Sequence, residues 1–301
     1  MTFPYPLAAP TVNGNEITVD RMLDEPTRIN RYLADESLLG YFAHRIFPTV
    51  GSVSGGAVLY TQLLANDIFP DPDRPDVQNI EPGGEYPVVA FTRPEPRTKQ
   101  VEKFGGKFEV TDEAKRRNDS TQLRQGTQKL AATINRQIHT RALAELNAEF
   151  TALGANAQTV TSVGWGSVVT SGTSQASAQE WPAADFAKVQ LVADQAELGV
   201  HFNVWIVNPV DATNFRLIYG KNWREVLQEN NTEFVVTNRQ PPGSAWVIED
   251  GRVGETRLEE PLNTISYREE GNDKTWVKSS VLPVNYVTNP YSVLKITGLG
   301  A

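Results

Sequence analysis

Hydrophobic residues recur every three or four positions in three stretches of the chain, which is the spacing of one face of an α-helix. The first stretch runs from Asp20 to Phe47, where Pro26 suits a helix start and Pro48 follows the last apolar residue. The second and longest runs from about 120 to 150 and would span roughly 46 Å as a single helix. The third covers 182–198 and is followed by a glycine. The spacing therefore predicts one unusually long helix with shorter helical regions before and after it.

Other stretches have the alternating or continuous apolar character of β-strands. The run FNVWIV at 202–207 is apolar almost throughout, which is typical of a strand covered on both faces, and an Asn-Pro step leads from it into a short helix at 211–219. Two segments, 264–268 and 275–278, flank a polar turn and predict a hairpin. Further strands are predicted at 57–64, 85–92, 107–110, 233–236, 245–249 and 291–297. Because helices and strands alternate irregularly, the predicted fold class is α+β.

The segment 57–107 is predicted to be a long two-stranded excursion with prolines along it and an acidic turn, DPDRPD, at 71–76. A hairpin of this kind has too little apolar surface to form a core of its own. It needs a partner to lie on. The first twenty residues contain three prolines and are expected to form an extended arm.

Composition and motifs exclude most kinds of chemistry. The 301 residues include no cysteine and only three histidines, which argues against thiolate chemistry and against a multi-histidine metal site. The sequence has no Walker loop, no nucleophile elbow and no His-Glu-x-x-His motif. We therefore expect no catalytic residue, no cofactor and no metal ion.

Charge and hydropathy give two further expectations. A net charge of −8 favours solubility and argues against a general polyanion binder. The N-terminus lacks the basic and apolar regions of a signal peptide, and the longest uncharged run, 150–179, is rich in Ser, Thr and Gly. We expect a soluble protein with no membrane segment.

One charge feature departs from this background. Between Lys115 and Arg141 the chain has seven basic residues against a single acid, Asp119. One interpretation is a solvated face balanced by acids from neighbouring elements. The other is a surface that contacts nucleic acid or an acidic subunit partner. The candidate residues are Lys115, Arg116, Arg117, Arg124, Lys129, Arg136 and Arg141.

The order of elements, together with three motifs, resembles the major capsid protein of tailed bacteriophages, whose fold is named after phage Hong Kong 97. The run FEVTDE from Phe108 resembles that family's strand-to-helix entry into its long spine helix. The run FNVWIVNPVDATNFRL at 202–217 is similar to its apolar strand, Asn-Pro turn and short helix. The run NPYSVLKITG at 289–298 resembles its closing strand.

The resemblance implies a division of the chain. Residues 57–107 would hold the E-loop, an extended hairpin that lies across a neighbouring subunit in this family. Basic residues expected at that intersubunit contact are Arg93, Arg97, Lys99 and Lys103. The expected parts are an N-terminal arm and helix (1–55), the E-loop (56–104), a P-domain (105–180) completed by the C-terminal strand (282–301), and an A-domain (181–281).

The resemblance also implies a function. The chain would be a structural protein without enzymatic activity that assembles with itself into hexamers and pentamers of an icosahedral shell enclosing double-stranded DNA. Because only about 55 residues precede the E-loop, we expect a separate scaffold protein; a portal and a decoration protein are further expected partners. Assembly would take place in the bacterial host cytoplasm, and the protein would reside in the virion. The lysine–asparagine crosslink of some members is not carried over, because its asparagine and glutamate have no match here.

Two alternatives remain open at the level of sequence. An encapsulin-like compartment shares this fold and would enclose protein cargo rather than DNA. An unrelated ligand-binding α+β protein would stay a small soluble species and would have a pocket with clustered titratable groups.

Overall fold

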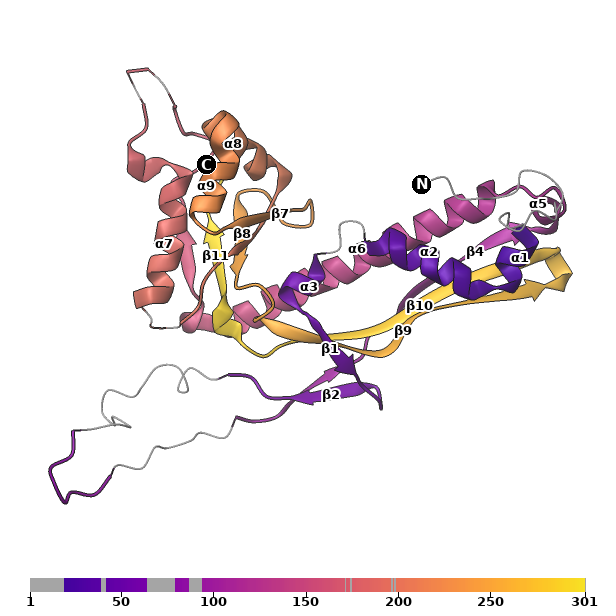
Figure 1. Ribbon diagram of the computed structural model, residues 1–301, viewed down its shortest axis with the longest axis horizontal. Coiled ribbons are helices and arrows are strands. Elements are labelled where there is room, and N and C mark those ends of the chain that lie inside the picture. The colour runs from indigo at the N-terminus through magenta and orange to yellow at the C-terminus, as the bar shows by residue number, and fades with distance from the viewer. Residues whose placement is uncertain are drawn as a thin grey trace.

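The computed structural model describes residues 19–38, 42–63, 79–86 and 94–300, apart from 171, 174, 196 and 198. The molecule is elongated, with a long helix and a long hairpin forming one arm, a compact unit at one end of that arm, and a second hairpin that projects away from both (Figure 1). The expected N-terminal arm up to residue 18, the acidic turn at 71–76, Arg93 and most of the strand expected at 85–92 lie outside the described residues.

Helix α6 (Thr121–Ala152) is the longest helix of the described structure and confirms the predicted long helix. Its 32 residues bury one apolar face along most of its length. Helix α2 (Pro26–Leu38) packs its Ile29 and Leu33 against the N-terminal half of that face, and it begins at the proline that the sequence marks as a helix start. The other helices of this region are α1 (Val19–Asp24), α3 (Ala43–Ile46) and α5 (Asp112–Arg116).

A four-stranded sheet lies along α6. In the order in which they pair, its strands are β1 (Thr49–Ser52), β9 (Gly254–Glu269), β10 (Lys274–Val287) and β4 (Phe104–Thr111). Strands β9 and β10 form one long antiparallel hairpin, and β4 pairs with β10 from Thr111↔Lys274 to Phe104↔Val281. Val277 and Val281 of β10 are buried in the core that includes α6 and α2.

The compact unit contains a five-stranded sheet, and three helices of the unit cover one of its faces. Its strands, in pairing order, are β5 (Thr159–Thr161), β11 (Val293–Thr297), β8 (Ser244–Ile248), β6 (Val204–Val207) and β7 (Glu233–Val236). The covering helices are α7 (Pro182–Gln195), α8 (Pro209–Tyr219) and α9 (Trp223–Glu229). All four residues of β6 are buried, because the C-terminal end of α6 and α3 cover the opposite face. This confirms the expected strand that is covered on both sides.

The projecting hairpin begins as a two-stranded sheet of β2 (Ala57–Tyr60) and β3 (Arg97–Gln100). Short 3-10 helices complete the described elements at Gly154–Asn156, Ala178–Glu180, Gly220–Asn222, Glu270–Asn272 and Pro290–Ser292. Among the described residues, no helix is long and apolar enough to cross a membrane.

The strand pairings correct the expected grouping of segments in two places. The hairpin predicted at 264–268 and 275–278 exists and is longer than expected, but it pairs with β4 beside α6 and not with the strands of 181–253. The closing strand β11 pairs with β5 and β8 of the compact unit, and so does not complete the sheet of the long helix. Both differences arise from hydrogen bonding between segments far apart in sequence, which hydrophobic periodicity does not encode.

Candidate assembly site at the base of the projecting hairpin

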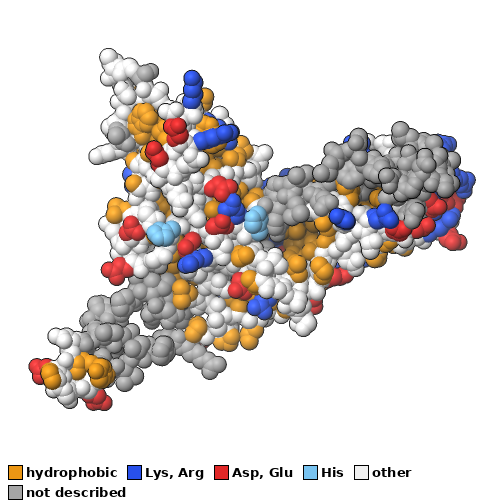
Figure 2. Space-filling model, in the orientation of Figure 1, with side chains coloured by type: hydrophobic (Ala, Val, Ile, Leu, Met, Phe, Trp, Pro, Cys, Tyr) orange, Lys and Arg blue, Asp and Glu red, His pale blue; other side chains and the backbone are white. Residues whose placement is uncertain are grey.

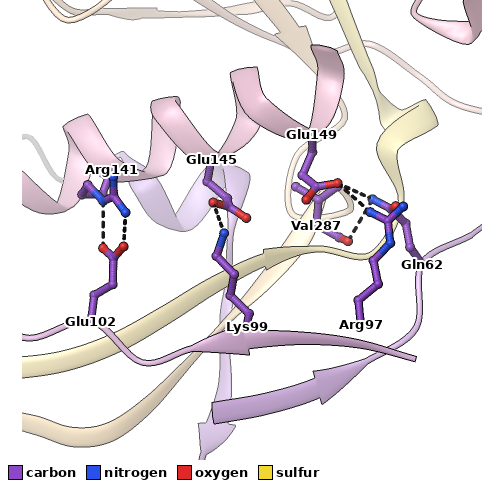
Figure 3. Close-up of polar contacts among 8 residues, drawn as sticks. All are labelled: Gln62, Arg97, Lys99, Glu102, Arg141, Glu145, Glu149 and Val287. Carbon is purple, nitrogen blue, oxygen red and sulfur yellow. Dashed lines mark hydrogen bonds and ion pairs between the residues drawn. The ribbon is translucent and has the colours of Figure 1, made fainter. Parts of the chain in front are cut away.

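Three ion pairs join the base of the projecting hairpin to helix α6 (Figure 3). Arg97 Nη1 lies 3.0 Å from Glu149 Oε2, and Lys99 Nζ lies 2.5 Å from Glu145 Oε2. The third pair has the opposite polarity: the Arg141 guanidinium donates two hydrogen bonds to the Glu102 carboxylate, one of them from Nε at 2.8 Å.

The local geometry of each element explains this arrangement. Residues 141, 145 and 149 are spaced by four and therefore share one face of α6, whereas 97 and 99 are spaced by two and share one face of β3. The helix presents one basic and then two acidic side chains, and the hairpin presents the complementary order of one acid and two bases. A shift of either element by one repeat would bring like charges together. The three pairs, which we call the ion-pair ladder, therefore set the register of the hairpin on the helix.

Neighbouring groups extend the ladder. Gln62, which follows β2, donates from Nε2 to Glu149 Oε2 at 3.1 Å and to the Val287 carbonyl at 3.4 Å. The hydrogen bonds from Arg141 hold the pKa of the Glu102 carboxyl below its usual range, against the opposing effect of partial burial. Both strands of the hairpin thereby gain polar contacts with α6 or β10.

A small apolar cluster lies beneath the ladder. Val58 and Tyr60 of β2 pack against Val284 and Tyr286 of β10, and the two tyrosine rings have centroids 4.8 Å apart. Burial and, to a lesser degree, a hydrogen bond to Glu255 raise the pKa of Tyr286 to about 12. The base of the hairpin is therefore attached to the body of its own chain, whereas the described residues 79–86, farther along the hairpin, lie away from it (Figure 1).

The hairpin also carries apolar side chains that this attachment leaves exposed. Leu59 is 69% exposed, and Tyr86, near the far end, is 80% exposed. Both side chains are therefore available for contact with another molecule.

The basic residues expected at the E-loop contact separate into three groups. Arg97 and Lys99 form ion pairs within the chain. Lys103 is exposed, and the described residues give it no ion pair. Arg93 lies outside the described residues.

The seven basic residues between 115 and 141 do not form one site. Lys115 pairs with Asp20 at 2.6 Å, and Arg141 belongs to the ladder. The other five are exposed, and within the described part of the chain they have no ion pair. Arg116 and Arg117 lie at the end of α5. The exposed side of α6 carries Arg124, Lys129 and Arg136. Two of the seven are thus balanced by acids of the same chain, and what the other five contact stays a prediction.

Sequence reasoning missed the residues that complete the ladder, namely Gln62, Glu102, Glu145 and Glu149. The available signal was the alternation of charge along 93–107 together with the four-residue spacing of charges in the last third of the long helix. No group of three or more His, Cys, Asp or Glu side chains that could hold a metal ion occurs among the residues described.

Comparison with known proteins shows to which family the chain belongs. The sequence profile of the family described as phage capsid protein matches residues 94–296, about two thirds of the chain. No curated protein matches this sequence. Among solved structures, the virus-like particle from Pyrococcus furiosus has a TM-score of 0.57 at 12% identity and covers 91% of this chain and 99% of that chain.

Phage capsids show the same fold. The capsid protein of cyanophage P-SCSP1u has a TM-score of 0.55 at 12% identity over 87% of this chain and 89% of that chain. The mature capsid of bacteriophage PhiM1 gives 0.51 at 11% identity over 85% and 86%. The fold is thus the one named after phage Hong Kong 97, as the resemblance implied, and the chain belongs to the phage capsid protein family and is a structural component of the virion shell.

Proposed function

We propose that this protein is the major capsid protein of a tailed phage, which forms hexamers and pentamers of an icosahedral shell around double-stranded DNA. The role is structural and involves no enzymatic turnover. Assembly takes place in the host cytoplasm with a separate scaffold protein, and a portal and a decoration protein are further proposed partners.

The observation that carries the proposal is the projecting hairpin fixed at its base by the ion-pair ladder. A hairpin that lacks a core of its own and yet is held at a defined angle can reach a neighbouring subunit in a reproducible way. Its exposed apolar residues would then be buried between subunits, which is the usual driving force of association. Many such weak contacts, repeated over a shell, give a stable particle through multivalency.

The parts of the fold have proposed roles. The hairpin at 56–104 acts as the E-loop. The long helix α6 with its four-stranded sheet acts as the peripheral P-domain. The five-stranded unit, which includes β11, acts as the axial A-domain, where neighbouring copies meet around the capsomer axis.

The five exposed basic residues from Arg116 to Arg136 are proposed to contact packaged DNA or an acidic surface of a neighbouring subunit. Contact with DNA would be made through phosphates and would carry no sequence preference. Aromatic side chains do not interleave these residues, so base stacking is not part of the proposal.

A protein-cargo compartment is the second candidate, and the similarity to the virus-like particle of Pyrococcus furiosus favours it. A ligand-binding role has less support. The apolar cavity between α2, α6 and the long hairpin has a volume of about 190 Å³, and none of the described residues that line it is titratable.

The test is to express the chain alone and together with the scaffold protein of its phage, and to examine the products by negative-stain electron microscopy and sedimentation. Closed shells or rings of five and six subunits are expected. Nuclease-protected double-stranded DNA in particles from infected cells supports the phage capsid, whereas copurified protein cargo without DNA supports the compartment. A monomer under both expression conditions would contradict both shell functions.

A further inference from the structure

Helices α8 and α9 carry a group of basic and apolar side chains on the outer surface of the five-stranded unit. Leu217 is 75% exposed. The guanidinium carbons of Arg216 and Arg224 lie 5.0 and 5.1 Å from the centroid of the Trp223 ring. These residues, together with the exposed Lys221 between the two helices, are called the α8–α9 patch. Figure 2 shows Lys and Arg side chains beside hydrophobic ones over this part of the molecule.

The α8–α9 patch contains two of the residue types, Trp and Arg, that are most enriched among those that dominate binding energy. The exposed Leu217 adds apolar area beside them. The cation–π contacts hold the two arginines in place and so reduce the entropy that they would lose on binding. In the described part of the chain, none of the three basic side chains has an ion-pair partner.

The C-terminal end of α7 has the complementary character. Leu191 is 51% exposed, and the exposed acids Asp194 and Glu197 follow it. Asp194 accepts a hydrogen bond from Gln190 Nε2 at 2.8 Å but, among the described residues, has no basic partner, and neither has Glu197. These three residues are called the α7 edge, and Figure 2 shows acidic side chains along this margin of the molecule.

The position of the acids relative to α7 adds to this argument, because Asp194 lies in its last turn and Glu197 follows its last residue, Gln195. Carboxylates near the C-terminus of a helix lie close to the negative end of its dipole, which disfavours them. A cation supplied from outside would offset that cost. The α7 edge therefore favours a basic partner for electrostatic reasons that its own chain does not satisfy.

We propose that the α8–α9 patch of one copy of this chain docks on the α7 edge of a second copy. Charge complementarity selects this occupant, because three bases and an exposed leucine meet two acids and an exposed leucine. The proposal rests on the proposed function, in which copies of the chain associate around an axis.

The arrangement of the helices suits a ring. Helix α7 lies at the outer margin of the compact unit, and α8 and α9 lie beside it, away from that margin (Figure 1). A contact between two different surfaces of the same chain is heterologous, and repeated contacts of this kind close into a ring when the rotation permits. The proposal thus assigns specific side chains to the contact that holds neighbouring copies within one capsomer.

A charge-swap experiment tests the pairing. The variants are Arg216→Glu/Arg224→Glu, Asp194→Lys/Glu197→Lys, and the combination of all four substitutions, each examined beside the wild type by electron microscopy and sedimentation. We expect each two-residue variant to lose rings and shells while retaining the circular dichroism spectrum of the wild type, and the combined variant to recover them. Leu217→Ser, which changes no charge, is expected to weaken assembly as well.

The outcomes separate this proposal from the function on which it rests. A wild type that forms no assemblies contradicts the proposed function. If the wild type assembles, the pairing is overturned when either two-residue variant assembles like the wild type, or when the combined variant fails to recover. Should a charge reversal prevent folding, the neutral variants Arg216→Gln/Arg224→Gln and Asp194→Asn/Glu197→Gln replace it, and unimpaired assembly of both would also overturn the pairing. A filter-binding assay with double-stranded DNA fragments tests the other possible occupant. If Arg216→Glu/Arg224→Glu binds less DNA than the wild type while its assembly is unchanged, the α8–α9 patch contacts nucleic acid and the pairing is wrong.

Discussion

Lys99 of the projecting hairpin and Glu145 of helix α6 form an ion pair in which the ammonium nitrogen lies 2.5 Å from a carboxylate oxygen. The Glu145 side chain is only 10% exposed, whereas that of Lys99 is 32% exposed. The other carboxylate oxygen of Glu145 is buried and has no hydrogen-bond partner within the described structure. Lys99 is therefore the main compensation for a charge that has largely been removed from water.

Substitution of Lys99 should destabilise the subunit through Glu145. We expect Lys99→Met, which keeps the aliphatic length, to lower the free energy of unfolding by about 1.5–3 kcal/mol, the usual worth of a hydrogen bond to a charged group. Replacing both partners, as in Lys99→Met/Glu145→Met, should recover part of the loss because no uncompensated charge remains. Urea unfolding measures all three values.

Lys103→Met is the matched control for this prediction. Lys103 lies in the same stretch, is exposed and has no ion pair in the described region, so its loss should change the free energy of unfolding by less than about 0.5 kcal/mol. Equal effects at positions 99 and 103 would show that the ion pair with Glu145 contributes nothing specific.

Gly126 provides a second prediction, about the packing of β4 on α6. A Cβ atom at this position would lie 2.3 Å from Cδ2 and 2.6 Å from Cγ of Phe108. Alanine gains about 1 kcal/mol over glycine in helix propensity. Overpacking costs about 1–3 kcal/mol, so we expect Gly126→Ala to be neutral to destabilising in spite of the propensity gain.

The effect of Gly126→Ala on stability should change sign when the Phe108 ring is absent. In a Phe108→Ala background the same Gly126→Ala change should stabilise the helix by up to about 1 kcal/mol. Thermal and urea unfolding of the four proteins of this double-mutant cycle give the coupling directly. A stabilising Gly126→Ala in the wild-type background would argue against close packing of Phe108 on the helix.

Gly126 also illustrates what the sequence could and could not predict. The helix that contains it was predictable, because apolar residues recur with helical spacing over some thirty positions. The reason for a glycine inside it was not, since Phe108 reaches it only after β4 has packed on α6. Periodicity identifies an element but not the neighbour that shapes it.

The same limit applies to the ion-pair ladder and to strand β1. Glu145 and Glu149 meet residues 46 and 52 positions away in sequence, a distance over which a charge pattern gives no pairing information. Strand β1 has four exposed residues and no hydrophobic alternation, and it exists because it pairs in parallel with β9, about 200 residues later. In contrast, β6 was predictable because all four of its residues are apolar, which is typical of a strand buried on both faces.

A third prediction concerns pH and His139. Its side chain is 1% exposed, its ring lies 4.1 Å from that of Phe42, and its Nε2 accepts the Phe42 backbone N–H at 3.1 Å. Burial, and to a lesser degree Arg239 and His44, lower the pKa of His139 to about 4. In the unfolded chain a histidine titrates near 6.5.

Between these two values the unfolded state binds more protons than the folded state, so stability falls as the pH is lowered. His139 contributes fully above about pH 6.5, and its contribution is lost as the pH decreases toward about 4. The slope attributable to this one group reaches at most about 1.4 kcal/mol per pH unit. Urea unfolding at several pH values should show a steeper acid loss for the wild type than for His139→Gln.

His201→Gln serves as the control, because His201 is exposed. This variant should keep the pH dependence of the wild type. Identical pH profiles for the wild type and His139→Gln would mean that the buried imidazole does not titrate differently in the two states.

The last prediction separates folding from assembly. Replacing residues 64–85 by a short Gly/Ser linker leaves in place β2, Gln62, β3 and all three pairs of the ion-pair ladder. We expect a subunit with nearly unchanged thermal stability that forms no closed shells, because the shortened hairpin can no longer reach a neighbouring subunit. Sedimentation and electron microscopy measure assembly, and circular dichroism measures folding.

Tyr86→Ser, which removes only the exposed ring near the far end, should weaken assembly without changing stability. Normal particles from the shortened chain would contradict the role assigned to the hairpin, and an unfolded product would show that the hairpin also stabilises its own subunit.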